Sequence, residues 1–350
     1  MKFLNLSRMS SGKTTIKDIA RRLDLAVSTV SRALNDSWEV SAETRERVLK
    51  AAREMDYHPN TQARGLVTRC SKVVGLVVPD LLSSTFFATI AKQIQATLHP
   101  QGYQVIVMQS NESSLEERRL IEILRGSNAD GIIICTANDS CYNRSLFEDL
   151  LREKTALVFI SRVCQMIPVP KIVVNDEEMA FRVTRHLVQQ GCRSIAYIAG
   201  PEGIPASQER QKGYIRALEE SHLPIREDMV IPTGLFVEDG IEAALRLLDS
   251  GCTPDGIFAI NDTVAFGVMK TLRQRGLRIP EDIAVAGFSE SFAATLVEPQ
   301  LTTVAQPLEE MGRLASKLLL KQLEGFEPAD TTLTLEGELR IRASSLRLKE

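Results

Sequence analysis

The chain has 350 residues, more than one domain usually holds, so two or three folded units are expected. Hydrophobic residues make up 44% and charged residues 25%, as in ordinary globular proteins, and the longest apolar runs are far shorter than the roughly 20 residues that span a bilayer. No secretory signal is visible, and the six cysteines form no C-x-x-C pair, which predicts a cytoplasmic protein with reduced thiols rather than disulfides or zinc ligands.

The net charge of −3 conceals an uneven distribution. Residues 1–72 carry 14 lysines and arginines against 8 acidic residues, a net charge of +6, whereas the rest of the chain carries −9. A basic segment on an acidic body suits nucleic-acid binding, because each cation that neutralises a phosphate releases counterions. A solvated charged surface would give the same balance, so the motifs within the segment must decide between the two.

Residues 1–13 show no periodicity and are expected to be a disordered extension. A first helix is predicted after Thr15, because Thr15 and Asp18 have the spacing of a capping box and the residues at 16, 19, 20 and 23 form one apolar face. A second short helix is predicted from Val27 to Leu34, with the side chains of Val30 and Leu34 buried. Its exposed face then carries hydroxyl groups and one arginine, at Ser28, Thr29, Ser31 and Arg32.

A third helix is predicted to begin at Ser41, a good N-cap, and to bury Val48, Ala52 and Met55. Three short helices around one core, the second presenting hydroxyl groups and an arginine, are typical of a helix-turn-helix headpiece, here residues 14–59. Short polar side chains let the backbone approach the major groove, and an arginine can grip guanine or bind phosphate.

Three blocks of sequence extend this interpretation: T-I-K-D-I-A-R-R-L-D-L-A-V-S-T-V-S-R-A-L-N (Thr15–Asn35), V-S-A-E-T-R-E-R-V (Val40–Val48) and Y-H-P-N-T-Q-A-R-G-L (Tyr57–Leu66). In this order and at this spacing they closely resemble the LacI/GalR family of transcriptional regulators. The resemblance implies base contacts from Val27 and Ser28, and a base or phosphate contact from Arg32. It implies contacts to the DNA backbone from Thr15, Thr29, Ser31 and Asn35.

One position departs from the family. The residue before the base-reading pair is usually a serine that caps the recognition helix, and here it is Ala26. Loss of this acceptor would cost the helix about 1 kcal/mol or remove a phosphate contact. The operator sequence therefore cannot be copied from a relative.

Residues 60–71 are predicted to be a hinge helix and linker. Asn60 could cap two helical turns, but a helix this short with a glycine inside is marginal alone. The resemblance implies that it becomes helical on DNA in a dimer, with Leu66 wedged into the minor groove and Ala63 against its partner. Arg64, in the same A-R-x-L context, is included among the DNA-binding residues, and an ordinary linker role for Leu66 is the alternative.

From residue 72 to 345, apolar strand-like runs alternate with amphipathic helices, which indicates parallel sheets in βαβ units. We expect two lobes, an N-lobe of about 72–169 and 304–330 and a C-lobe of about 170–303 and 331–345. The strands are predicted at 73–79, 103–109, 131–135, 156–161, 171–174, 194–199, 256–261 and 282–288, with a further strand-like stretch at 331–341. The fold class is thus an all-α helix-turn-helix headpiece plus an α/β core of two parallel-sheet lobes, and the resemblance implies a core like the periplasmic binding proteins.

Ligands of open α/β sheets bind beyond the carboxyl ends of the strands. Polar residues gather there, and two phenylalanines could stack on a ring face, which suits a polyhydroxylated or heterocyclic ligand. The resemblance adds A-G-P (Ala199–Pro201), R-x-x-G-Y (Arg210–Tyr214), A-I-N-D-x-x-A-F-G (Ala259–Gly267) and L-T-T-V-x-Q-P (Leu301–Pro307). The predicted effector contacts are Asp80, Phe86, Phe87, Ser161, Arg162, Arg210, Asn261, Asp262, Ser289 and Glu290.

Four of these positions carry alternatives. Arg210 stands where the family anchors its effector, but an interlobe or surface salt bridge is also possible, and Asp262 could instead cap the following helix. Ser161 and Ser289 stand where the family often has aspartate, so the pocket could favour an acidic or phosphorylated sugar, or use Glu290 as the acceptor.

The predicted function is a dimeric repressor of carbohydrate-utilisation genes that a sugar or sugar derivative releases from a pseudo-palindromic operator. No heptad repeat follows the core, which favours a dimer over larger assemblies. A corepressor-dependent repressor or an activator that responds to another metabolite is the alternative, and a sugar-binding transport component is a distant one. No catalytic motif or histidine cluster is visible, so we expect no enzyme activity, no cofactor and no metal ion.

Overall fold

A computed structural model describes residues 14–34, 38–57, 70–81, 85–139, 141–327 and 330–347. The chain divides into two compact units, Met1–Ser71 and Lys72–Glu350, which we treat separately as the headpiece and the core. None of the helices within the described ranges is long and apolar enough to cross a membrane.

The headpiece consists of three short helices, α1 (Ile16–Leu23), α2 (Val27–Leu34) and α3 (Ala42–Glu54). Asp18 closes the predicted cap of α1, because its carboxylate accepts bonds from the backbone N–H of Thr15 at 2.9 Å and from the hydroxyl of Thr15 at 2.6 Å. These two bonds lower the pKa of the Asp18 carboxyl. Ser41 caps α3 as predicted, accepting from the backbone N–H of Thr44 at 3.2 Å.

One small core joins the three helices. Ile19, Val30 and Val48 are fully buried in it. The prediction for α2 was wrong at one position: Ala33, which follows Val30 at i+3, is buried, whereas Leu34 is only partly buried. Two or three buried residues from each short helix form this core and fix how α2 lies on its neighbours.

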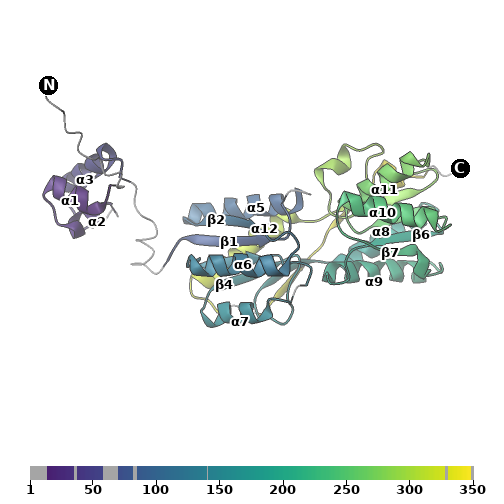
Figure 1. Cartoon of the computed structure of the whole chain (residues 1–350), viewed down its shortest axis with the longest axis horizontal. Helices are drawn as coiled ribbons and strands as arrows, with labels where there is room; N and C mark the ends of the chain where they lie inside the picture. Colours follow the sequence, from purple (N-terminus) through teal and green to yellow (C-terminus); the bar gives the residue numbers. More distant parts are fainter. Residues whose placement is uncertain are drawn as a thin grey trace, which may run out of the picture. The chain divides into compact units, whose positions relative to one another are not determined.

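The first lobe of the core is a parallel sheet covered on both faces (Figure 1). Its strand order is β11-β5-β4-β3-β1-β2, with β1 (Val73–Val78), β2 (Gln104–Gln109), β3 (Gly131–Ile134), β4 (Ala156–Ile160), β5 (Lys171–Val174) and β11 (Thr332–Leu335). Helices α5 (Thr85–Leu98) and α12 (Leu308–Leu323) pack on one face, and α6 (Ser114–Gly126) and α7 (Arg144–Arg152) on the other. Leu76 and Val77 point to opposite faces, so the continuous apolar run of β1 serves both.

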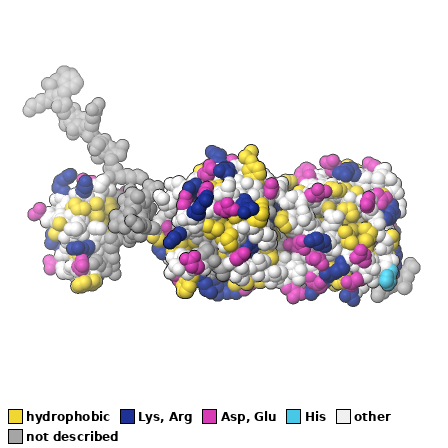
Figure 2. Space-filling model, turned by 90° about the horizontal axis from the view of Figure 1, so that it is seen from below, with side chains coloured by type: hydrophobic (Ala, Val, Ile, Leu, Met, Phe, Trp, Pro, Cys, Tyr) yellow, Lys and Arg dark blue, Asp and Glu magenta, His cyan; other side chains and the backbone are white. Residues whose placement is uncertain are grey.

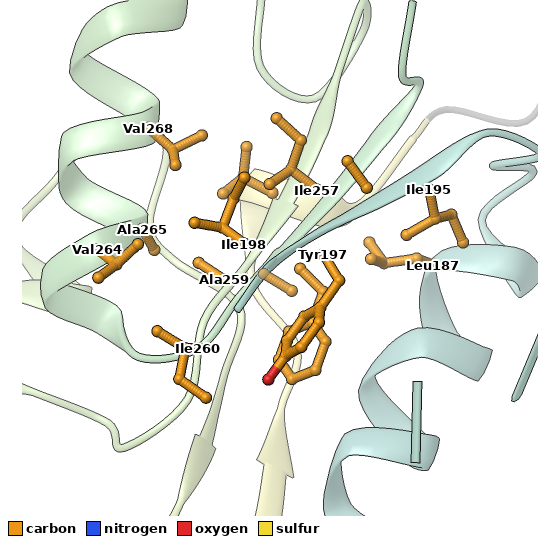
Figure 3. Close-up of a cluster of buried hydrophobic side chains, with 14 of the residues drawn as sticks. Leu187, Ile195, Tyr197, Ile198, Ile257, Ala259, Ile260, Val264, Ala265 and Val268 are labelled. Atoms are coloured by element: carbon orange, nitrogen blue, oxygen red, sulfur yellow. The ribbon is translucent and has the colours of Figure 1, made fainter. Parts of the chain in front are cut away.

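The second lobe has its own parallel sheet, β7-β6-β8-β9, with bounds Val230–Pro232, Ile195–Ala199, Gly256–Ala259 and Ala284–Ala286. Its helices are α8 (Asp176–Gln189), α9 (Pro205–Glu220), α10 (Val237–Asp249) and α11 (Asp262–Gln274), and a short antiparallel pair joins β10 (Thr303–Ala305) to β12 (Glu338–Arg340). Figure 3 shows how Ile198, Ile257 and Val268 share one apolar cluster between the sheet and α11. Single 3-10 turns lie at His99–Gln101, Glu227–Met229, Phe292–Thr295 and Ala343–Ser345.

The predicted lobe boundaries were wrong at two strands. Strand β5 and strand β11 both belong to the first sheet, although they were assigned to the second lobe. The chain therefore crosses between the lobes three times, after strands β5, β10 and β11, near residues 175, 306 and 336. The stretch 331–341 is two strands in different sheets, because an apolar pattern shows that a segment pairs but not with which neighbour.

The prediction that all cysteines are reduced was also wrong. Cys141 and Cys164 form a disulfide, with their Cα atoms 5.1 Å apart. They follow the adjacent strands β3 and β4, so the loops that carry them lie side by side at one edge of the sheet. The cysteines at 135, 192 and 252 are free thiols, as expected.

Candidate functional site

The candidate DNA-binding surface is the exposed face of α2. Val27, its first residue, is 42% exposed, Ser28 and Arg32 are exposed, and Thr29 and Ser31 are partly exposed. Ser28 and Arg32 are one helical turn apart and therefore share a face. Because α2 anchors itself through Val30 and Ala33, this polar face is left free for a partner.

Arg32 on this surface and Thr15 at the start of α1 already have partners within the headpiece. The guanidinium Nε of Arg32 lies 2.8 Å from a carboxylate oxygen of Glu39, and both side chains are about half exposed. The hydroxyl of Thr15 donates to Asp18. Arg32 must therefore exchange a carboxylate partner for a DNA group when it binds. The remaining predicted DNA contacts lie outside the described residues, at Asn35, Asn60, Ala63, Arg64 and Leu66.

The candidate effector site is a cavity between the two lobes of the core. The space between its walls measures about 860 Å³, a volume that includes open solvent. Nine of the ten predicted effector residues line it: Asp80, Phe86, Phe87, Ser161, Arg162, Arg210, Asn261, Asp262 and Ser289. They come together because the carboxyl ends of both sheets face the same space.

Two of the strand ends carry unusual backbone conformations. Ser161 has a backbone φ of 65° and Ser289 one of 123°. Residues other than glycine rarely adopt positive φ, because it strains the backbone. Both residues line the cavity. Strained residues are retained where the surrounding fold forces them, and they concentrate at ligand sites, so these turns support the assignment of the cavity.

Arg210 is the most constrained cation of the cavity. Its Nε donates to a carboxylate oxygen of Asp176 at 2.8 Å, one terminal nitrogen donates to the carbonyl of Ile260 at 2.5 Å, and its guanidinium stacks 3.6 Å from the ring centre of Phe288. Burial raises the pKa of the Asp176 carboxyl, and Arg210 opposes that rise. The predicted alternatives were therefore not exclusive, because Arg210 lines the cavity and also forms a salt bridge within its own lobe.

The first lobe contributes a second buried ion pair. Arg162 donates to Glu112 at 2.6 Å, and their side chains are only 12% and 14% exposed. Glu112 lines the cavity and was missed by sequence reasoning, because it stands in a polar loop without any motif. Each arginine of the cavity thus has a carboxylate partner close by.

Two buried hydroxyl groups of the cavity have no hydrogen-bond partner among the described residues, those of Ser207 and Ser291. Buried polar groups are normally bonded, so these groups await a ligand or a water molecule. Sequence reasoning missed both, although Ser207 lies one turn before Arg210 on α9 and could have been found by that spacing. Gln306, in the quoted L-T-T-V-x-Q-P block, also lines the cavity and donates to the hydroxyl of Ser289 at 3.3 Å.

Two predicted roles at this end of the sheet were wrong. Asn261, and not Asp262, caps α11, since its side chain accepts from the backbone N–H of Val264 at 2.8 Å. Glu290 does not line the cavity, because its carboxylate pairs with Arg342. It therefore does not replace the missing aspartate as an acceptor.

Asp262 should make the stability of the core depend on pH. It is 1% exposed, and burial raises the pKa of its carboxyl from 3.8 to about 6 against the bonds that it accepts from Thr303 and the backbone of Ser291. The folded protein then binds this proton more tightly than the unfolded chain. The free energy of unfolding should fall by roughly 2 kcal/mol as the pH rises from about 4 to about 6.

Chemical denaturation of the parent and of Asp262→Asn across this pH range measures the effect. The difference between the two curves should change with pH, because the other buried carboxyls with raised pKa, Glu117 and Asp176, are present in both proteins and cancel. Parallel curves would show that Asp262 does not titrate in this window.

Within the described ranges, no group of three or more histidine, cysteine or acidic side chains is arranged to hold a metal ion. On the face seen in Figure 2, acidic and basic side chains are interspersed over the core. The features that stand out are therefore the polar face of α2 and the cavity between the lobes.

Comparison with known proteins accounts for both parts of the chain. Residues 15–60 match the bacterial regulatory proteins of the lacI family, and residues 184–345 match the periplasmic binding protein-like domain. The chain is 32% identical over 333 residues to the HTH-type transcriptional regulator DegA of Bacillus subtilis, covering 95% of this chain and 98% of the relative. It is 33% identical to the ribose operon repressor of Halalkalibacterium halodurans, covering 91% and 92%. A solved complex of the transcriptional regulator CelR with cellobiose is 31% identical, with a TM-score of 0.72 over 95% of this chain and all of that one.

Proposed function

The chain belongs to the LacI family of bacterial regulatory proteins and is a DNA-binding transcriptional regulator, and we propose that it is a dimeric repressor that a sugar releases from a pseudo-palindromic operator. The observation that carries this proposal is the cavity between the lobes, into which buried polar side chains of both sheets converge. Relatives named for ribose and solved with cellobiose support a sugar as the ligand. A regulator of this kind works in the cytoplasm, where its DNA lies.

The charges of the cavity favour a neutral sugar over the acidic or phosphorylated one considered above. Arg162 and Arg210 are each paired with a buried carboxylate, and Asp80 and Asp262 add further acidic groups to the lining. An anionic ligand would be repelled by these carboxylates, and both arginines already have their charge balanced by a carboxylate. The repulsion is stronger in a site of low dielectric constant. Phe86 and Phe87, whose rings meet edge to face, offer an apolar surface for a sugar ring.

Titration calorimetry tests the ligand class directly. A panel of neutral mono- and disaccharides, including ribose and cellobiose, is compared with glucose 6-phosphate. We expect binding from a neutral sugar and none from the phosphate ester; tight binding of phosphorylated sugars alone would contradict the charge argument.

Repression is tested with a duplex that carries the pseudo-palindrome nearest to the protein's own gene, with and without the bound sugar. Loss of the complex on sugar addition supports release, whereas tighter binding would favour the corepressor mode. Sedimentation of the free protein tests the dimer, and Leu66→Ala tests the hinge, since it should weaken the complex by removing the minor-groove wedge.

Arg32→Ala should reduce sequence preference more than affinity. A bidentate arginine contact discriminates against a wrong base by about 1–3 kcal/mol, so the ratio of operator to single-substitution binding should fall by roughly tenfold at one position. Arg21→Ala is the control, since Arg21 is an exposed arginine on α1 and its loss should weaken all sequences equally. A parent-like preference in Arg32→Ala would remove Arg32 from the base-reading set.

A further inference from the structure

Trp38 is the only tryptophan of the chain, and its side chain is exposed to solvent. Its side chain is 89% exposed, more than any other large hydrophobic side chain within the described residues. A tryptophan can bury roughly 150–250 Å² of surface, and such rings are concentrated where a protein meets a partner. An aromatic ring so fully exposed in the isolated protein therefore indicates a surface that something else covers.

The segment that carries this ring is held beside the recognition helix. Glu39, the next residue, forms the ion pair with Arg32 of α2, and Val40 is 8% exposed within the headpiece core. Ser41 then caps α3. Trp38 is thus attached to a segment with two anchors, and its neighbour Glu39 is paired with Arg32 in the last turn of α2.

DNA is the partner that fits this position. The headpiece is basic, and a recognition helix lies in the major groove between two phosphate backbones. The indole N–H is a donor without acceptor capacity, and phosphate oxygens are acceptors only. The flat apolar face of the ring suits the deoxyribose beside that phosphate.

We propose that Trp38 contacts the sugar-phosphate backbone of the DNA half-site, with its indole N–H donating to a phosphate oxygen and its ring covering the adjacent sugar. This inference rests on the proposed function, in which the headpiece binds duplex DNA. A contact of this kind carries no base information and, being uncharged, releases no counterion. It adds affinity that is the same for every sequence.

Binding of a labelled operator duplex and of a labelled scrambled duplex, measured by fluorescence anisotropy at several salt concentrations, tests these properties. Trp38→Ala should weaken both duplexes by about tenfold, the usual effect of a bond to a charged group, and leave the salt dependence unchanged. Trp38→Phe, which keeps a ring but lacks the N–H, should lie between. Ile225→Ala, which removes a 45% exposed side chain from the second lobe, should bind as the parent does.

The single tryptophan supplies an independent signal. Its emission should be quenched, and shielded from acrylamide, when scrambled duplex is added to the full chain. Because the side chain is exposed, Trp38→Ala should melt at the same temperature as the parent in circular dichroism, so weak binding cannot come from a misfolded headpiece.

Each other outcome overturns the inference. If the labelled duplexes bind but emission and the affinity of Trp38→Ala are unchanged, Trp38 does not touch DNA, and the proposed function stands. If the loss is confined to the operator, the ring reads bases rather than backbone. If acrylamide shielding grows with protein concentration alone, a second copy covers the ring. If the parent binds neither duplex, the proposed function fails as well.

Discussion

Replacing Arg210 with methionine should weaken sugar binding at least about 100-fold while leaving the headpiece able to bind DNA. Arg210 gives one N–H bond to Asp176 and one to the carbonyl of Ile260, and a further nitrogen lies 2.8 Å from the same Asp176 oxygen, so at least two of its five N–H groups remain for a ligand in the cavity. Bonds to charged groups are each worth about 1.5–3 kcal/mol, and two lost bonds give this factor. Calorimetry with the sugar that binds the parent measures it.

The same substitution should also destabilise the second lobe by about 3–5 kcal/mol, because Asp176 is left buried without its cation. The double variant Arg210→Met with Asp176→Asn separates the two effects. It should recover most of the stability, since the buried charge is gone, but it should not recover sugar binding. Lys212→Ala is the control on the same helix, because Lys212 is exposed and pairs only on the surface with Glu209.

Sugar affinity equal to that of the parent in Arg210→Met would limit Arg210 to a structural role. The same conclusion would follow if sugar binding were lost in the single variant and fully restored in the double variant. Binding would then depend on the stability of the lobe and not on a contact from Arg210. Only persistent loss in the well-folded double variant supports a direct contact.

Adding one methyl group at Gly213 should cost about 3 kcal/mol or more of folding stability. Helices α8 and α9 approach so closely here that a Cβ atom at Gly213 would lie 2.1 Å from the backbone oxygen of Glu177 and 2.8 Å from the backbone nitrogen of Phe181. Backbone atoms cannot turn aside as a side chain can, so the two helices must separate and lose packing. Chemical denaturation of Gly213→Ala measures the loss.

Gly126→Ala is the matched control. This glycine also lies in a helix, the last turn of α6, but a Cβ atom there would meet nothing within 4 Å. Alanine should therefore stabilise the protein by about 0.5–1 kcal/mol, through the lower backbone entropy of the unfolded chain. If both variants were equally stable, the contact of α8 with α9 would be more adaptable than its geometry indicates.

The R-x-x-G-Y block illustrates how a motif combines roles that sequence alone does not separate. Arg210 reaches the cavity, Gly213 permits the close approach of α8, and Tyr214 is fully buried with its hydroxyl bonded to the carbonyl of Ile195 at 2.8 Å. The resemblance indicated Arg210 alone as functional. The glycine and the tyrosine position the helix that carries it.

The sequence by itself determined the features that depend on near neighbours. The caps at Thr15 and Ser41, the apolar faces of the headpiece helices and the apolar runs of the buried strands all follow from spacings of a few residues, and they predicted the elements well. The cavity lining was largely predictable too, because parallel strands bring their carboxyl ends to one edge wherever the sheet is formed.

Only the tertiary structure decided which distant groups meet. Arg162 pairs with Glu112 across 50 positions of sequence, Arg210 with Asp176 across 34, and Cys141 with Cys164 across 23. Strand β11 joins the first sheet from the far end of the chain. The local sequence pattern indicates that a side chain is polar or that a strand is buried. Which partner it meets depends on the order of the strands and the path of the loops, and these depend on the packing of the whole core. For this reason the site could be located from the sequence, whereas its charge balance could not.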